Sequence, residues 1–116
     1  MLKLTEFLHA RLTELAEQQK NSSTAWHRRD CAYLPEPGMY DAECDCGVPE
    51  RVLAETEAKQ RVVKAYDNAV ISFGHTEVGA PLHDLMGGSV NSLRHVLQLL
   101  ALPYSGHPNY KEEWKP

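Results

Sequence analysis

The feature that most constrains this chain is a segment near its C-terminus that is apolar around most of its circumference. Between residues 90 and 102, leucine and valine recur at spacings of three and four residues, which is typical of a helix. One stripe holds Val90, Leu93, Leu97 and Leu100, and a second holds Val96, Leu99 and Leu102. A helix with two apolar stripes is expected to lie between neighbours, or between a neighbour and a second subunit.

Two further helices are predicted upstream. Over about 2–20, leucines at positions 4, 8, 12 and 15 share one helical face. A second helix is predicted over about 49–72, where Pro49 suits a first helical position because its missing N–H has no partner to lose there. The apolar C-terminal segment extends this pattern to a third helix over about 82–102. Gly87 and Gly88 weaken that helix by about 1 kcal/mol each, yet we favour one continuous helix over a separate short turn.

Residues 21–48 and 103–116 lack a sustained period. The first of these segments contains Pro35, Pro37, Gly38 and Gly47, and an irregular connection of this length is unusual inside a compact domain. The composition, 42% apolar and 24% charged over 116 residues, is nevertheless that of a folded single domain. We therefore predict one all-α domain over 1–116, a three-helix bundle with a long irregular connection between helices 1 and 2 and an aromatic C-terminal tail.

Charge and hydropathy narrow the expected partners and compartment. The formal net charge of −4 works against broad nucleic-acid binding, which needs a clustered positive surface. The longest apolar run, 99–102, is far below the roughly 20 residues that span a bilayer, so no membrane helix is expected. The N-terminus has no apolar core of a signal peptide, and three cysteines do not form a paired disulfide framework. A reducing cytoplasm is the expected location.

One group of residues has metal-ligating chemistry. His27, Cys31, Cys44 and Cys46 all lie in the irregular connection, and four imidazole and thiolate ligands suit tetrahedral zinc. A zinc ion would also hold a long loop in a fixed shape. Cys-x-Cys is less diagnostic than the Cys-x-x-Cys of zinc ribbons, so we prefer ordinary reduced thiols and no cofactor, with zinc as the alternative. Redox chemistry at the same thiols is less favoured still.

No catalytic motif is present, and we expect no enzyme. Six histidines scattered along the chain meet a cysteine–histidine requirement by chance. Trp26, Arg28 and Arg29 combine an aromatic ring with two cations, which is a small footprint for stacking on a base and contacting phosphate. In an acidic chain we interpret these residues as a solvated loop, with nucleic-acid binding as the alternative.

The tail supplies Tyr104, His107, Tyr110 and Trp114. Aromatic side chains bury large areas, so we interpret the tail first as a strap across the helix ends. The same residue types are enriched at binding hot spots, so a protein-docking surface is the functional alternative. Neither interpretation gives the tail a catalytic role.

Three blocks also resemble a known group of proteins: LTEFLHARLTE, PERVLAETEAKQRVV and LQLLALPYSGHPNYKEEWKP. They resemble a family of small uncharacterised proteins encoded by actinobacteria and their phages. The resemblance implies no activity, cofactor or catalytic residue, since the family's function is unknown. Cys44-Asp45-Cys46-Gly47 stands where many relatives have a His-Asp-Pro type of approach, so zinc would be a feature of this protein and not of the family.

The function predicted from these observations is that of a small, non-enzymatic accessory protein, of phage or prophage type, which binds another protein in the cytoplasm of a bacterial host, where it could modulate a host factor. A homodimer is expected as an option because the third helix has an excess apolar face. The alternative from another class is a zinc-stabilised nucleic-acid-binding module that uses residues 26–46.

Overall fold

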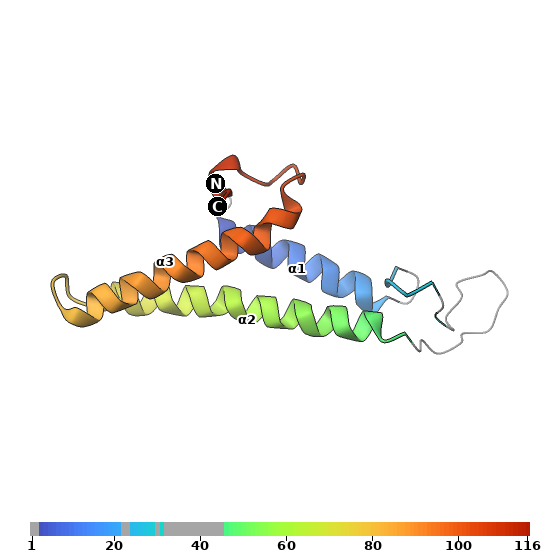
Figure 1. Ribbon diagram of the computed structural model, residues 1–116, viewed down its shortest axis with the longest axis horizontal. Helices are drawn as coiled ribbons and strands as arrows, with labels where there is room; N and C mark the ends of the chain where they lie inside the picture. Colours follow the sequence, from blue (N-terminus) through green and yellow to red (C-terminus); the bar gives the residue numbers. More distant parts are fainter. Residues whose placement is uncertain (1–2, 22–23, 30, 32–45) are drawn as a thin grey trace.

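The computed structural model describes residues 3–21, 24–29, 31 and 46–116. Its helices are α1 (Leu4–Lys20), α2 (Val48–Gly74) and α3 (Pro81–Ala101), followed by two short 3₁₀ turns, η1 (Leu102–Tyr104) and η2 (Glu112–Trp114) (Figure 1). The described part of the chain contains helices and turns and no strand. The prediction of an all-α fold with three helices and an aromatic tail is confirmed.

The helix starts follow from local chemistry. At the start of α1 the Lys3 N–H donates to the Glu6 carboxylate at 3.3 Å, which satisfies one of the amides that a helix leaves without a partner. Gly47 precedes α2 with φ of +71°, a left-handed conformation that favours glycine, and Pro49 follows within the first turn. Proline is also the first residue of α3. The ends of α2 and α3 therefore lie within two residues of the predicted positions.

The third helix runs through Gly87 and Gly88 without a break. A Cβ atom built on Gly87 would lie 3.2 Å from the ring of Phe73 on α2, whereas one on Gly88 would meet nothing within 4 Å. Gly87 therefore permits a close approach of α2 and α3. The loss of helix propensity at this position is offset by packing between the two helices.

The long α2 is the element against which the other two helices pack (Figure 1). The end of α1 lies near Leu53 and Thr56, at the beginning of α2, whereas the start of α1 lies near Val63 and Asp67. The helices α1 and α2 are therefore antiparallel. The first half of α3 returns along the end of α2 as a two-helix hairpin that extends beyond α1 (Figure 1).

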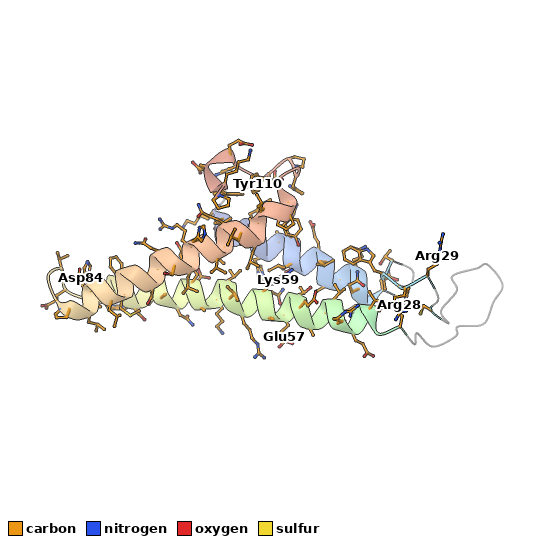
Figure 2. The ribbon with its side chains drawn as sticks, in the orientation of Figure 1. Arg28, Arg29, Glu57, Lys59, Asp84 and Tyr110 are labelled. Carbon is orange, nitrogen blue, oxygen red and sulfur yellow. The ribbon has the colours of Figure 1, made fainter. Side chains whose placement is uncertain are left out.

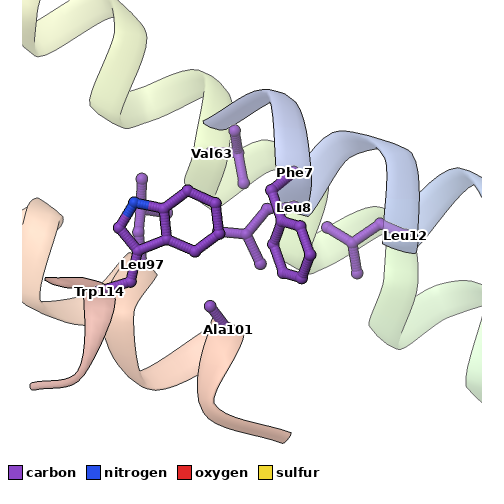
Figure 3. Close-up of a cluster of buried hydrophobic side chains, with 7 residues drawn as sticks. All are labelled: Phe7, Leu8, Leu12, Val63, Leu97, Ala101 and Trp114. Atoms are coloured by element: carbon purple, nitrogen blue, oxygen red, sulfur yellow. The ribbon is translucent and has the colours of Figure 1, made fainter. Parts of the chain in front are cut away.

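The core lies where all three helices and the tail meet. Its fully or largely buried side chains come from α1, α2, α3 and η2 (Figure 3): Phe7, Leu8, Leu12, Val63, Leu97, Ala101 and Trp114. Thr56 is also buried, and its hydroxyl donates to the Val52 carbonyl at 2.7 Å, which removes the cost of burying a polar group. One contiguous cluster thus joins elements from both ends of the sequence.

The tail wraps around Phe7. The ring of this residue lies 5.0 Å from that of Trp114, 5.6 Å from His107, 6.1 Å from Tyr110 and 6.3 Å from Tyr104, measured between centroids. Three of these four contacts are edge-to-face, the arrangement that aromatic quadrupoles favour. Burial raises the pKa of the Tyr104 phenol, against an opposing effect of Arg11, so the phenol stays neutral near neutral pH.

We expect Tyr110→Phe to stabilise the fold. The Tyr110 hydroxyl oxygen is buried, and no hydrogen-bond partner lies within reach of it among the described residues. Removing this oxygen relieves an unsatisfied polar group and should raise the free energy of unfolding by about 1 kcal/mol in urea titration. Tyr66→Phe is the matched control, because the Tyr66 hydroxyl accepts a hydrogen bond from Arg94 at 3.4 Å. A loss of stability in Tyr110→Phe, equal to that of the control, would contradict the prediction.

Among the described residues, none of the helices combines the length and the apolar character needed to cross a membrane.

Candidate functional site

A cluster of thiols and imidazole lies between the end of α1 and the start of α2. The ligand atoms of His27, Cys31 and Cys46 all lie within 4.8 Å of one another. These are three of the four residues that the sequence offers for zinc. The fourth, Cys44, lies outside the described residues.

The histidine is at the centre of this cluster. Its Nδ1 atom lies 3.5 Å from the Cys31 sulfur and 3.7 Å from the Cys46 sulfur. Cys31 is buried, whereas His27 and Cys46 are partly buried, so the cluster is shielded but not closed to solvent. Neither described cysteine forms a disulfide.

The end of α1 positions the first half of the cluster. Only 3% of the surface of Gln19 is exposed, and its side-chain oxygen accepts a hydrogen bond from the Trp26 N–H at 3.0 Å. The hydroxyl of Thr24 donates to the Gln18 carbonyl at 2.8 Å. Because the chain is tied back to the helix at these two points, His27 follows at a defined place.

Turns at each end then bring the two thiols to the imidazole. The Cys31 N–H donates to the Arg28 carbonyl at 3.0 Å, and this turn carries the Cys31 thiol back toward His27. Cys46 stands directly before Gly47, whose positive φ redirects the backbone into α2. The cluster therefore joins the two described ends of the connection.

The residues predicted for nucleic acid lie beside this cluster. Trp26 is half exposed, and both Arg28 and Arg29 are exposed at the same end of the molecule (Figure 2). One exposed aromatic ring and two exposed cations therefore share one end of the molecule. Their use in nucleic-acid binding stays a prediction.

The residues predicted for protein docking in the tail face inward. Trp114 is buried, and Tyr104, His107 and Tyr110 are partly buried around Phe7. This placement fits the strap interpretation, because a ring that fills the core of its own chain offers little surface to a partner. The docking role of these four residues stays a prediction without support from their packing.

The outward face of α3 carries an apolar stripe, only part of which the sequence analysis identified. Positions 82, 85, 89, 92, 96 and 99 recur at alternating spacings of three and four residues, as in a heptad repeat. Four of these residues are exposed aliphatic side chains: Leu82 (55%), Leu85 (67%), Val96 (38%) and Leu99 (47%). The spacing is present in the sequence. Because Gly87 and Gly88 weaken helix propensity, however, the sequence analysis did not assign Leu82 and Leu85 to a stripe.

Small residues occupy the middle of this face, which we call the α3 seam (residues 82, 85, 89, 92, 96 and 99). A shallow hollow there is lined by Asp84, Leu85, Gly88, Ser89, Ser92 and Leu93. The Ser89 hydroxyl donates to the Leu85 carbonyl of its own helix at 3.3 Å. This hydroxyl is therefore satisfied within the helix and does not need water when the seam is covered.

Comparison with known proteins assigns the family. The model of a family of unknown function, DUF6221, matches residues 1–116. The chain belongs to this family. The match covers the whole chain and confirms the resemblance to a family without an assigned function. No curated protein and no solved structure matches the chain.

Membership of DUF6221 assigns no role to any residue. The two features that the geometry sets apart are the thiol–imidazole cluster and the α3 seam. They lie toward opposite ends of the molecule, as the positions of Arg28 and Asp84 show in Figure 2. Each can therefore be tested without disturbing the other.

Proposed function

We propose that this DUF6221 protein acts by binding protein through the α3 seam, without catalysis, and that the seam binds a second copy of the same chain. The observation that carries the proposal is the heptad spacing of exposed aliphatic side chains on α3. Exposed apolar faces of this kind mark interaction surfaces in soluble proteins. The setting as a phage or prophage accessory protein remains the implication of the sequence resemblance.

The argument for a second copy is the symmetry of the seam. When two α3 helices lie antiparallel about a two-fold axis between residues 90 and 91, position 82 faces 99, 85 faces 96, and 89 faces 92. Leucine and valine then meet at both ends of the interface, and the serines meet at its centre. A two-fold interface requires such self-complementarity, because the same patch is used by both subunits.

The small residues at the centre favour close packing of the two helices. The distance between helix axes depends on the side chains at the contact, and serine allows a short distance at the crossing point. The hollow beside Gly88 provides space there. The seam spans 18 residues, about 27 Å of helix.

The seam also completes a packing arrangement. Beyond α1, the hairpin of α2 and α3 has only two helices, and two helices bury only their facing sides. Pairing two such hairpins through α3 would place each α3 between its own α2 and a second copy. This accounts for the second apolar stripe of the helix.

Analytical ultracentrifugation over a range of concentrations tests the proposal, and we expect a dimer that dissociates on dilution. Leu85→Glu should shift the protein to monomer at every concentration while its helical circular dichroism is retained, because Leu85 contacts solvent in the single chain. Ile71→Glu is the matched control, since Ile71 is an exposed aliphatic residue (59%) on α2, outside the seam. A wild-type protein that remains monomeric at high concentration would refute the dimer.

A charge exchange tests the antiparallel register. Leu82→Glu alone and Leu99→Lys alone should each weaken association, whereas the double variant should restore it. In the antiparallel dimer each glutamate faces a lysine, but in a parallel dimer like charges would face each other. A double variant that associates less than either single variant would exclude the antiparallel seam.

A further inference from the structure

The two nitrogen–sulfur separations at His27, Cys31 and Cys46 match those of a tetrahedral metal site, and all three ligand atoms lie within 4.8 Å of one another. Zinc–sulfur bonds of about 2.3 Å and zinc–nitrogen bonds of about 2.0–2.1 Å, meeting at tetrahedral angles, place nitrogen and sulfur about 3.5–3.6 Å apart. The observed distances from His27 Nδ1 to the two sulfurs are 3.5 and 3.7 Å. From these distances we propose that the three residues bind one zinc ion.

Hydrogen bonding alone is a poorer account of the same geometry. A neutral imidazole has one acceptor nitrogen, and its lone pair accepts one good hydrogen bond. Here two sulfurs lie at nearly equal distances from the same Nδ1 atom. A metal ion at the centre would use that lone pair together with both thiolates, so a single species explains both contacts.

The donor set suits zinc and disfavours calcium and magnesium. Thiolate and imidazole are ligands that suit zinc, whereas calcium and magnesium require oxygen ligands. Cys31 is buried, and burying a thiolate is favourable only when a cation compensates its charge. The three protein ligands leave one tetrahedral position, for which the sequence offers Cys44, outside the described residues.

The position of the cluster indicates a structural role for the metal. His27 and Cys31 follow α1, and Cys46 immediately precedes α2, so one ion would connect residues that are 15 to 19 positions apart in the chain. Closing a loop of this length restricts the unfolded chain and stabilises the folded one. The ion would hold the start of α2 against the end of α1, at the end of the bundle opposite the α3 hairpin.

Metal analysis of the full chain, purified with a non-thiol reductant after growth with added zinc, tests this site. We expect about one zinc per chain, and about two to three protons released per ion in calorimetry, one for each thiol that deprotonates. Cys46→Ser and His27→Ala should each lose stoichiometric zinc. His9→Ala, a change of an exposed histidine on α1, should keep it. Each variant is expected to stay folded, because the core around Phe7 lies toward the other end of α1. Circular dichroism checks this.

Cobalt substitution and proteolysis give independent readouts. Bound Co²⁺ should show charge-transfer absorption from thiolate, which is absent from Cys46→Ser. X-ray absorption should find two or three sulfur ligands and at least one nitrogen. Chelation should speed tryptic cleavage after Arg28 and Arg29, which lie between two of the ligands, without changing the oligomeric state.

Several outcomes would overturn the site. These are zinc below stoichiometric amounts in the folded wild type, retention of zinc in Cys46→Ser, fewer than two sulfur ligands, or copper or iron in place of zinc. A disulfide between Cys31 and Cys46 under the same reducing conditions would also exclude it, because oxidised sulfurs cannot act as thiolate ligands. None of these results bears on the α3 seam, whose test is the association of the chain.

Discussion

Leu97→Asp is expected to abolish cooperative folding. Leu97 has no exposed surface and lies in the core cluster with Phe7 and Val63, so the new carboxylate would have neither water nor a partner. The loss of packing together with an unpaired buried charge should cost about 4–5 kcal/mol or more, which is most of the stability of a small domain. The measurement is thermal unfolding followed by circular dichroism, where we expect no cooperative transition.

Two controls separate charge burial from a general effect of the substitution. Leu97→Met conserves volume and should cost less than about 1.5 kcal/mol. Leu99→Asp places the same charge two residues further along α3, on the exposed seam, and should leave the fold intact while weakening association. A cooperative transition in Leu97→Asp close to that of Leu99→Asp would mean that Leu97 does not lie in the core of the folded chain.

Trp114→Ala is expected to lower the free energy of unfolding by about 3–5 kcal/mol, the usual cost of removing a large buried aromatic side chain. Only 7% of the surface of Trp114 is exposed. The centroid of its ring lies 5.0 Å from that of Phe7 and 5.6 Å from that of Tyr110. Its removal leaves a cavity and releases the end of the strap. Urea titration should show a lower midpoint.

The chain provides its own control, because it has only one other tryptophan. Trp26 is 50% exposed, and Trp26→Ala should change the free energy of unfolding by no more than about 0.5 kcal/mol. If the two variants unfolded at the same urea concentration, the tail would not be a structural strap, and a docking role for Tyr104 and Tyr110 would gain support.

The helices themselves were predictable because their signals are local. The repeat of apolar residues in α1, the proline at the start of α2 and the glycine before it all act within a few residues of chain. The continuity of α3 through Gly87 does not follow from local sequence, because glycine weakens the interior of a helix. A Cβ atom at position 87 would lie 3.2 Å from the ring of Phe73 on α2, so glycine there lets the two helices pack closely. This packing depends on residues of different helices.

The candidate site was only partly predictable. Sequence identified His27, Cys31 and Cys46 by residue type, but spacing could not tell whether their ligand atoms meet. Their meeting depends on the hydrogen bonds of Gln19 and Thr24 and on the turn at Gly47, none of which is a metal-site motif. The assignment of Leu82 and Leu85 to the seam depended in turn on which face of α3 packs on α2.

By itself, the sequence determined that this chain forms three helices with an aromatic tail, and it named the residues capable of binding metal. The tertiary structure decided which of the two apolar stripes of α3 is buried, that the tail encloses Phe7, and that two thiols meet one imidazole. The physical reason is that periodicity and capping act over a few residues, whereas burial and ligand geometry depend on residues far apart in the chain.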